Sequence, residues 1–331
     1  MNIVEFRNVS IDYKMKRYDL RAVNQVDFDL QKGKITALVG ESGSGKTTFA
    51  TALINCISAP GEIAFGSILY YGKDKAKPID VTKLSEKELN MFRWSKVSMV
   101  FQGAQSSLNP VMKTFDQFYE TLQVHRQGKI TLEEAKTIST SCLEYVNLDA
   151  TRILGSYPHE LSGGMKQRAM IAFSLLLDPE IVILDEPTTA LDVINQDYVF
   201  SILKRINAER NITMLLLTHD IAVVSKYADF VGVMYGGSMM EYGDTLNVFK
   251  YKYHPYTEGL INATPSLLKN LDAMRPIEGS PPNLLEPIQG CVFYPRCHKR
   301  LPICELHEPA TYPNPSGGSC KCWLFENKVK S

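Results

Sequence analysis

Short apolar and polar segments alternate along residues 3–39. The alternation is clearest in three segments, Ile3 to Phe6, Ser10 to Tyr13 and Val26 to Leu30. A period of two residues is typical of strands that bury one face and expose the other. The pattern therefore predicts a layer of antiparallel strands at the start of the chain.

Other segments are apolar without interruption. Ile35 to Val39, Ile181 to Leu184 and Met214 to Leu217 are short apolar runs, and each leads directly into polar residues. Runs of this kind predict buried strands in the centre of a sheet. Two further β-prone runs, Ser67 to Tyr71 and Val97 to Phe101, are also predicted as strands.

Helical spacing appears between these strands. Thr48 to Ile57 contains few helix breakers and predicts a helix directly after the first buried strand. Phe115 to His125 and Leu132 to Val146 carry apolar residues at helical intervals. Both lie within residues 103–160, so this region is predicted to be a helical insertion in an α/β domain.

A phosphate-binding motif lies between the first buried strand and its helix. Residues 40–47 read Gly-Glu-Ser-Gly-Ser-Gly-Lys-Thr and fit the pattern G-x-x-x-x-G-K-[ST]. A strand–loop–helix unit points backbone N–H groups and the positive end of the helix at an anion, and glycines let the backbone bend closely round it. A glycine-rich turn that matches by chance is the alternative, and the flanking strand and helix favour nucleotide binding.

Each residue type in this loop has an expected task. Lys46 should reach the β- and γ-phosphates, and the Thr47 hydroxyl should ligate Mg²⁺. Tyr13 is a candidate platform for a purine ring, although an aromatic residue in a strand often serves packing alone. The residues expected to hold the nucleotide here are Tyr13, Gly40, Ser42, Gly43, Ser44, Gly45, Lys46, Thr47 and Thr48.

Polar residues follow three of the predicted strands. Asp185 and Glu186 come after one buried strand, at the sheet edge where α/β proteins bind ligands, and His219 comes after another. Asp185 is expected to hold Mg²⁺, while Glu186 and His219 should face the γ-phosphate. Gln102 ends a third strand, and its amide can bond Mg²⁺ or the attacking water. Taken singly, these residues could be a solvated turn or ordinary strand ends, and the phosphate loop favours the catalytic interpretation.

A second anion-binding sequence follows the helical insertion. Ser162 suits a helix N-cap, and Gly163 and Gly164 lie beside that helix start. One triphosphate does not need two such sites. We therefore expect the second site to serve a nucleotide held by another subunit.

The charge balance limits the possible partners. Lys plus Arg and Asp plus Glu are both 36, which gives a formal net charge of zero. This balance does not support a broad nucleic-acid surface or a polybasic membrane anchor. No signal-peptide pattern opens the chain, and no apolar run approaches the ~20 residues needed to cross a bilayer. We expect a soluble, cytoplasmic protein that reaches a membrane through a partner.

The seven cysteines are distributed unevenly. Cys56 and Cys142 are isolated and are expected to be small buried hydrophobic residues. The other five crowd into a Pro-rich tail, which in a reducing compartment indicates metal rather than disulfides. The separations between the first three exceed those usual for structural zinc and favour a [4Fe–4S] cluster, with zinc or an oxidised thiol cluster as alternatives. These five residues are Cys291, Cys297, Cys304, Cys320 and Cys322.

Together these motifs resemble the ATP-binding cassette family over residues 3–250. Six motifs occur in the order of that family, and one departs from it at Met165, where most cassettes carry glutamine. The resemblance identifies the phosphate loop at residues 40–47, the Q-loop Gln102, the signature Leu161 to Met165, the acids Asp185 and Glu186, the D-loop Asp192 and the switch His219.

The family resemblance implies a fold and a mechanism. The fold would be an α/β P-loop NTPase with a RecA-like core, an antiparallel β-layer and a helical subdomain at about residues 103–160. Two cassettes would close head to tail, each holding ATP between its own phosphate loop and the partner's signature and D-loop, at Ser162, Gly163, Gly164 and Asp192. Thr47, Gln102 and Asp185 would manage Mg²⁺, and Glu186 would orient or deprotonate the attacking water.

A narrower resemblance is to the peptide-permease subfamily. Ser106 to Met112, His254 to Thr257, and the tail segments Gly290 to Cys297 and Cys322 to Leu324 carry it. It implies an importer of di- or oligopeptides, with relatives for nickel or oligosaccharides. It also makes Cys322 rather than Cys320 the fourth cluster ligand, beside Cys291, Cys297 and Cys304, and divides the chain into a cassette at 1–250 and an extension at 251–331.

The subfamily resemblance implies partners as well. These are a second cassette subunit, expected to be a paralogue, two membrane-spanning permease subunits and an external solute-binding protein, with no nucleic acid. The chain would then work at the cytoplasmic face of the membrane. The alternatives are a soluble cassette acting on DNA or ribosomes, and a regulatory module with structural ATP. The chain is too short for the tandem cassettes of the first, and the intact Glu186 argues against the second.

Overall fold

The computed structural model describes residues 1–16, 18–72, 77–103, 106–189, 191–263, 276–286 and 288–326. The chain forms two compact units. The first unit combines residues 1–31, 36–82 and 217–331, and the second combines residues 32–35 and 83–216. The first unit thus joins both ends of the chain, and the second is formed from its middle.

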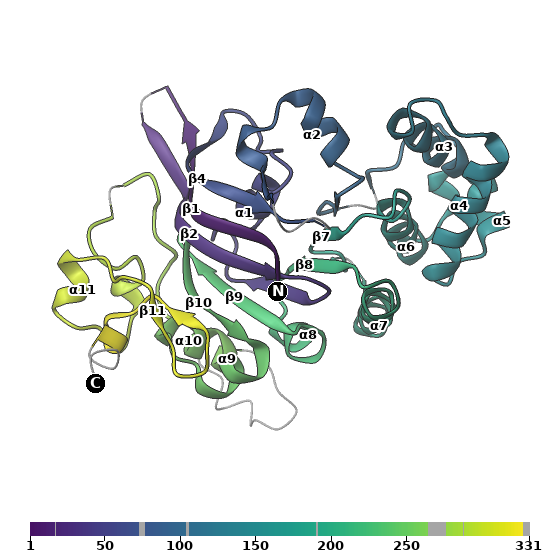
Figure 1. Ribbon diagram of the computed structural model, residues 1–331. Coiled ribbons are helices and arrows are strands. Elements are labelled where there is room, and N and C mark those ends of the chain that lie inside the picture. Colours follow the sequence, from purple (N-terminus) through teal and green to yellow (C-terminus); the bar gives the residue numbers. More distant parts are fainter. Residues whose placement is uncertain are drawn as a thin grey trace. The chain divides into compact units, whose positions relative to one another are not determined.

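An antiparallel sheet opens the first unit, as the alternating pattern predicts (Figure 1). β1 pairs antiparallel with both β2 and β4. Two segments that the sequence suggests as separate strands, Ile3 to Phe6 and Ser10 to Tyr13, lie in the single strand β1. The register of β1 shifts between Phe6 and Val9, and Asn8 there has a φ of 52°. Such a bulge changes which side chains face the core, so the alternation breaks without ending the strand. The sheet order is β2 (Asp19–Gln31), β1 (Asn2–Lys14), β4 (Gly61–Tyr70) and β5 (Ile79–Asp80).

The phosphate loop belongs to a second sheet of the first unit. Strand β3 is buried along its whole length and runs parallel to β9. Helix α1 follows β3 but ends at Ala52, earlier than the predicted Ile57, because a turn with Asn55 at a φ of 45° breaks it. The strands that the first unit contributes to this sheet are, in order, β11 (Tyr312–Pro313), β12 (Ser319–Cys320), β10 (Ser238–Asp244), β9 (Phe230–Tyr235) and β3 (Ile35–Val39).

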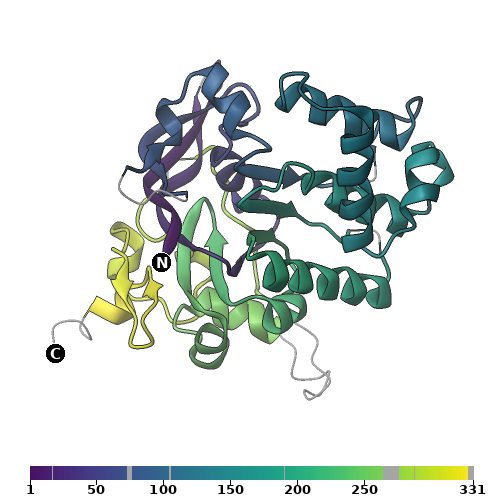
Figure 2. The same cartoon turned by 45° about the vertical axis from the view of Figure 1, so that its right-hand side comes forward.

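Helices and the tail complete the core of this sheet. The tail residue Phe293 packs in one cluster with Tyr235 of β9 and Tyr256 of α10, and all three are almost completely buried. Strand β12 also pairs with β10, so Figure 2 shows the yellow tail beside the green strands. The tail is therefore part of the unit that carries the phosphate loop. The helices and 3₁₀ turns of this unit are α1 (Lys46–Ala52), η1 (Val81–Lys83), which crosses into the second unit, α8 (Ile221–Tyr227), α9 (Thr245–Tyr251), α10 (Pro255–Ala263), η5 (Tyr294–Arg296), α11 (Ile303–Leu306) and η6 (Trp323–Phe325).

The second unit contains a parallel pair of strands and the helical insertion. β6 and β7 pair in parallel, and β7 is buried at every residue. Helices α3 and α4 confirm the two helices predicted from spacing, within one residue at their ends. Its elements are α2 (Glu86–Phe92), β6 (Val97–Val100), α3 (Thr114–His125), α4 (Leu132–Tyr145), α5 (Ala150–Gly155), η3 (Pro158–Glu160), α6 (Gly163–Ser174), β7 (Ile181–Asp185), α7 (Val193–Arg210) and β8 (Thr213–Leu217).

Within the described ranges, none of the helices has both the length and the apolar content needed to span a membrane.

Candidate functional site

The phosphate loop connects β3 to α1 through backbone conformations that favour glycine. Gly40, Gly43 and Gly45 have φ angles of 151°, 78° and 97°. A Cβ at Gly40 would lie 2.1 Å from the carbonyl oxygen of Met234, and a Cβ at Gly45 would lie 2.6 Å from that of Ala22. At Gly43, by contrast, no atom of the described residues beyond its chain neighbours lies within 4 Å of the Cβ position. The loop is therefore packed tightly at both ends and open in the middle, as a phosphate cradle requires.

Lys46 is folded back over this loop. Its Nζ donates to the carbonyl oxygens of Gly40, at 2.8 Å, and Glu41, at 3.0 Å, and to Oγ of Ser44, at 3.3 Å. The side chain is largely buried, while the neighbouring Thr47 is exposed. A buried ammonium group beside an open loop, next to an exposed hydroxyl, is a donor set that fits a phosphate and its Mg²⁺.

Tyr13, the predicted purine platform, and His219, the predicted switch histidine, lie in the same unit as the loop. The Tyr13 hydroxyl lies 3.3 Å from Oγ1 of Thr48, in the first turn of α1. His219 is exposed and directly precedes Asp220, whose side chain caps α8 by accepting from the backbone N–H of Ala222 at 2.8 Å. Tyr13 is thus close to the loop, as the sequence predicts.

The predicted catalytic residues of the second unit lie at the ends of its strands. Asp185 is buried at the end of β7, and Glu186 follows it with a φ of 45°. The Glu186 carboxylate accepts from Nε2 of Gln102 at 3.1 Å and from Oγ1 of Thr189 at 3.2 Å. The structure therefore brings Gln102 and Glu186 together, as expected for a site that handles water and metal.

The signature sequence begins helix α6. Ser162 is its N-cap and accepts from the backbone N–H of Met165 at 3.4 Å, while Ser162 and Gly163 remain exposed. A Cβ on Gly164 would lie 3.9 Å from the side chain of Leu191. The signature and the D-loop are thus neighbours, and both present polar groups to solvent.

Asp192 caps the next helix, α7. Its carboxylate accepts from the backbone N–H and from Nδ2 of Asn195, at 2.9 and 2.6 Å. These hydrogen bonds lower the pKa of Asp192, so it stays ionised. The D-loop aspartate predicted from sequence therefore also has a structural task as a cap.

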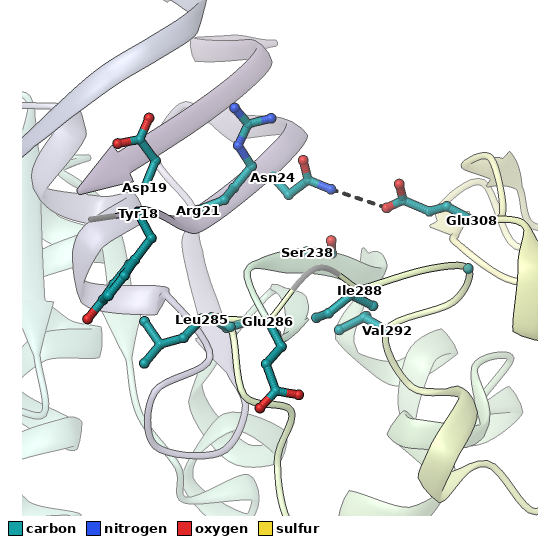
Figure 3. A pocket seen from close by; sticks show the side chains of 13 residues that line it. Tyr18, Asp19, Arg21, Asn24, Ser238, Leu285, Glu286, Ile288, Val292 and Glu308 are labelled. Carbon is teal, nitrogen blue, oxygen red and sulfur yellow. Dashed lines mark hydrogen bonds between the residues drawn. The ribbon is translucent and has the colours of Figure 1, made fainter. Parts of the chain in front are cut away.

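A cavity of about 400 Å³ opens elsewhere in the first unit (Figure 3). Arg21, one of its lining residues, is paired with Asp12 at 2.8 Å, and Asn24 donates to Glu308 at 3.3 Å. Arg21 is thus paired with a carboxylate outside the lining, and Glu308 accepts from the neutral amide of Asn24. Among the described residues that line this cavity, none is a site residue predicted from sequence.

The cysteines differ in part from expectation. Cys142 is buried, as predicted, but Cys56 is exposed, so that prediction is wrong. The reason is that α1 ends at Ala52 and Cys56 lies beyond the following turn. All seven cysteines lie in the described part of the chain and are free thiols.

Four tail cysteines gather in one region. The backbone N–H of Cys291 donates to the carbonyl oxygen of Cys304 at 2.8 Å. Burial, and to a lesser extent the nearby thiols of Cys291, Cys297 and Cys304, together raise the pKa of Cys322 to about 12. Cys320 instead lies opposite Glu241 where β12 pairs with β10. Burial is the main cause that raises the pKa of Cys320, and the charge of Glu241 raises it as well. Within the described residues, no group of three or more His, Cys, Asp or Glu side chains has an arrangement that could hold a metal ion.

Sequence reasoning missed three residues that support the phosphate loop. Glu41 occupies a variable position of the loop motif, and it contacts Tyr256 and Arg296. Both partners lie in the segments that carry the subfamily resemblance, His254 to Thr257 and Gly290 to Cys297. These two segments have no task assigned from sequence, and that was the signal that could have drawn attention to Tyr256 and Arg296.

A glycine-rich loop between a buried parallel strand and a helix, with a lysine held over it, defines a phosphate-loop nucleotide-binding protein. Comparison with known proteins narrows this class. A family model described as "ABC transporter" matches residues 23–189, and one described as "Oligopeptide/dipeptide transporter, C-terminal region" matches residues 240–304.

Curated relatives align along almost the whole chain. The dipeptide transport ATP-binding protein DppD of Caldanaerobacter subterraneus is 39% identical over 324 residues, which are 98% of this chain and 97% of the relative. The oligopeptide transport ATP-binding protein OppD of Escherichia coli is 40% identical over 308 residues, 93% and 89% of the two chains. This chain therefore belongs to the ABC transporter family.

Solved structures agree with this assignment. A dimeric bacterial ABC transporter cassette, MJ0796, matches with a TM-score of 0.64 and 26% identity, over 73% of this chain and 98% of that one. A post-hydrolysis dimer of MJ0796 bound to ADP and Pi matches with a TM-score of 0.62 and 28% identity over the same shares. The predicted cassette fold is thus confirmed, while a metal-binding extension is not shown by these comparisons.

Proposed function

We propose that this chain is the ATP-hydrolysing subunit of a membrane importer for di- and oligopeptides. The observation that carries the proposal is the identity of 39–40% with ATP-binding proteins of dipeptide and oligopeptide transport, over nearly their full length. The match includes the C-terminal region that is described for such transporters.

The cassette would work as a head-to-tail dimer. Each ATP would lie between the phosphate loop of one chain and the signature of the other, contacted there by Ser162, Gly163, Gly164 and Asp192. The exposure of Ser162 and Gly163 at the start of α6 supports this assignment, because a group that serves a partner's nucleotide has to face outward. The partner would be a second cassette subunit, most simply a paralogue.

The proposed catalytic roles follow from the motifs. Lys46 and His219 would hold the γ-phosphate, and Thr47, Gln102 and Asp185 would hold Mg²⁺, which neutralises phosphate charge. Glu186 would orient the attacking water and accept its proton. Phosphoryl transfer depends mainly on positioning and charge stabilisation, so closure of the dimer assembles the catalyst.

The hydrogen bond between Gln102 and Glu186 supports a coupling role for the Q-loop. Gln102 follows β6, and the helical insertion with α3, α4 and α5 comes next in the chain. A change at the nucleotide would reach this insertion through Gln102. We propose that the insertion contacts a membrane-spanning permease subunit, at the cytoplasmic face of the membrane, beneath a complex fed by an external binding protein.

The tail would hold a [4Fe–4S] cluster through Cys291, Cys297, Cys304 and Cys322. The crowding of five cysteines in the tail supports this proposal, and the thiols of Cys291, Cys297 and Cys304 lie near enough to Cys322 to influence its charge, although in the described residues these side chains are not arranged as a metal site. The position of Cys320 opposite Glu241 in the sheet favours Cys322 as the fourth ligand. Such a cluster supplies cross-links between segments that have little regular structure. The proposed division into a cassette at 1–250 and an extension at 251–331 places all four ligands in the extension.

Reconstitution tests the importer proposal. The chain would be purified with its partner cassette and two permease subunits, placed in vesicles, and supplied with the binding protein. We expect peptide-loaded binding protein to stimulate ATP hydrolysis and peptide to accumulate. A complex of the Glu186→Gln variant is the control for ATP dependence. Accumulation of nickel or oligosaccharide instead would contradict the peptide assignment, and hydrolysis that ignores every loaded binding protein would contradict import.

A further inference from the structure

The side chain of Arg296 lies in the tail, next to Cys297, yet it is bonded to the phosphate loop. Its Nη1 donates to Oε2 of Glu41 at 2.7 Å, and its Nη2 donates to Oε1 at 3.0 Å. The Arg296 side chain is 5% exposed and that of Glu41 is 26% exposed. A two-point pairing of this kind fixes the orientation of both groups as well as their separation.

Every N–H group of Arg296 has an acceptor. Besides Glu41, Nη1 donates to the Tyr235 hydroxyl at 3.2 Å, Nη2 to the carbonyl oxygen of Ile277 at 3.2 Å, and Nε to that of Glu278 at 2.9 Å. The guanidinium also lies 5.6 Å from the centroid of the Tyr235 ring. Arginine has five N–H donors in a planar fork, so this site uses the whole group, and lysine could not reproduce it.

Glu41 connects this arginine to the part of the loop that would bind phosphate. Its backbone N–H donates to the hydroxyl of Tyr256 at 3.0 Å. Glu41 is therefore held through its backbone by Tyr256 and through its carboxylate by Arg296. Its carbonyl oxygen accepts from Nζ of Lys46, also at 3.0 Å, and from the backbone N–H of Ser44 at 3.2 Å. A shift of Glu41 would therefore move the acceptor that positions Lys46.

The charge of Glu41 also requires compensation. The residue directly follows Gly40 in a loop that is expected to bind a triphosphate. An unpaired carboxylate beside phosphate groups repels them, and the repulsion grows in a partly buried site. The Arg296 guanidinium cancels this charge at the loop itself.

We propose that Arg296 is a positioning residue of the nucleotide site. It acts through Glu41, by fixing the phosphate loop and by cancelling a negative charge beside it. The inference rests on the proposed binding of ATP by this loop. It makes the tail a working part of the ATPase and not an appendage to it.

A set of four proteins tests the proposal in the full-length chain: wild type, Arg296→Gln, Glu41→Gln and the double variant. Calorimetry gives the MgATP affinity of each. Arg296→Gln should weaken it by about tenfold or more, because a carboxylate is left unpaired beside the phosphates. Glu41→Gln removes that charge and should stay within about threefold of wild type. The double variant should recover most of the loss, since it also lacks the carboxylate.

Arg300→Gln is the matched control. Arg300 is exposed, its guanidinium lies 5.6 Å from the centroid of the Tyr294 ring, and its replacement removes the same charge from the same segment. It should leave MgATP affinity unchanged. Melting temperatures without nucleotide check folding, and Arg296→Lys, which keeps the charge but not the fork, should show an intermediate loss if Arg296→Gln does not fold.

The outcomes separate this inference from the proposed function. Wild-type affinity in Arg296→Gln, or a double variant as weak as Arg296→Gln, would overturn the positioning role. Failure of the wild-type chain to bind MgATP would overturn the proposed function itself.

Discussion

Glu186 has a backbone conformation that few residues with a side chain adopt. Its φ of 45° lies in the left-handed region, directly after the buried strand β7. This turn directs the carboxylate away from the strand, where Gln102 and Thr189 hold one of its oxygens. A left-handed residue other than glycine costs about 1–2 kcal/mol, so the rest of the unit has to support it.

Glu186→Gln should keep MgATP binding and lose turnover. The amide is nearly isosteric with the carboxylate but cannot accept a proton, and general-base catalysis contributes about 10²–10⁴-fold. Phosphate release by the assembled transporter measures the loss, and calorimetry measures binding. Lys46→Ala is the contrasting variant, because it should weaken binding itself. Turnover near the wild-type rate would show that Glu186 is not the base.

His254 and Glu241 form a buried polar pair of a different kind. The backbone N–H of His254 donates to Oε2 of Glu241 at 2.9 Å, and its Nδ1 accepts from the backbone N–H of Tyr256 at 3.0 Å. Burial lowers the pKa of His254 to about 3 and raises that of Glu241. The imidazole is therefore neutral in the folded protein at physiological pH, and it links the start of α10 to β10.

Folding stability should decrease as the pH falls below about 6.5. The unfolded chain then protonates His254, while the folded chain does so only near pH 3, so the unfolded state gains protons first. The loss approaches about 1.4 kcal/mol per pH unit. Urea unfolding at pH 7.5 and 5.5 measures it. His254→Gln, which retains Glu241, should lose this component of the pH dependence, and an unchanged pH dependence would contradict the assignment.

At the scale of elements, side-chain caps decide where several helices begin. Ser162 caps α6, and the capping box of Thr131 and Glu134 begins α4, with the Thr131 N–H donating to the Glu134 carboxylate at 2.9 Å. The cap of α6 is special because it lies in the signature sequence. Its hydroxyl orders the helix start while the adjacent glycine stays open to solvent.

Ser162→Arg should stop hydrolysis without removing ATP binding by the same chain. A bulky cation at this exposed cap would block closure against the partner's nucleotide and leave residues 40–47 intact. Calorimetry should give an affinity near that of wild type, and phosphate release should fall to the background level. The idea fails if this variant loses its own nucleotide affinity as severely as Lys46→Ala does.

Local patterns predicted the elements well where one rule governed a whole segment. The helical spacing of residues 115–125 and 132–146 is sufficient to predict α3 and α4, and for α4 the capping box of Thr131 and Glu134 agrees with it. The alternation predicts two strands where the structure has the single strand β1, because the bulge at Asn8 reverses it. Helix α1 was predicted too long because a turn, and not a breaker residue, ends it at Ala52.

The assigned site residues stay predictions, and they follow from motifs with a fixed order along the chain. The ion pair between Glu41 and Arg296 could not be predicted, because the two residues are 255 positions apart and neither motif specifies the other. The boundary at residue 250 remains a prediction. The tail belongs to the same compact unit as the phosphate loop, so sequence composition alone did not indicate how closely the two are connected.

At the scale of the whole molecule, the tail holds the cysteines against the core of the first unit. Cys291 and Cys304 belong to the same buried cluster as Val39 of β3 and Tyr235 of β9. Any group that crosslinks these cysteines would therefore stabilise more than the tail. The phosphate loop begins directly after Val39, so it would share that support.

Anaerobically purified protein should be brown, absorb broadly near about 400 nm and contain about four irons per chain. Iron analysis and absorption spectra measure this. Cys322→Ser should lose the iron, and Cys320→Ser is the matched control that should retain it. Colourless anaerobic protein with one tightly bound zinc would contradict the cluster and leave the ATPase proposal unaffected.

The pairing of Arg296 with Glu41 in the phosphate loop also has a consequence during biosynthesis. Glu41 leaves the ribosome early, but its partner Arg296 is made 255 positions later. Translation adds about 5–20 residues per second, so at least about 13 s pass between the synthesis of Glu41 and that of Arg296. A nascent chain would thus carry a complete phosphate-loop motif without a complete nucleotide site. The chain would bind ATP tightly only after Arg296 has left the ribosome.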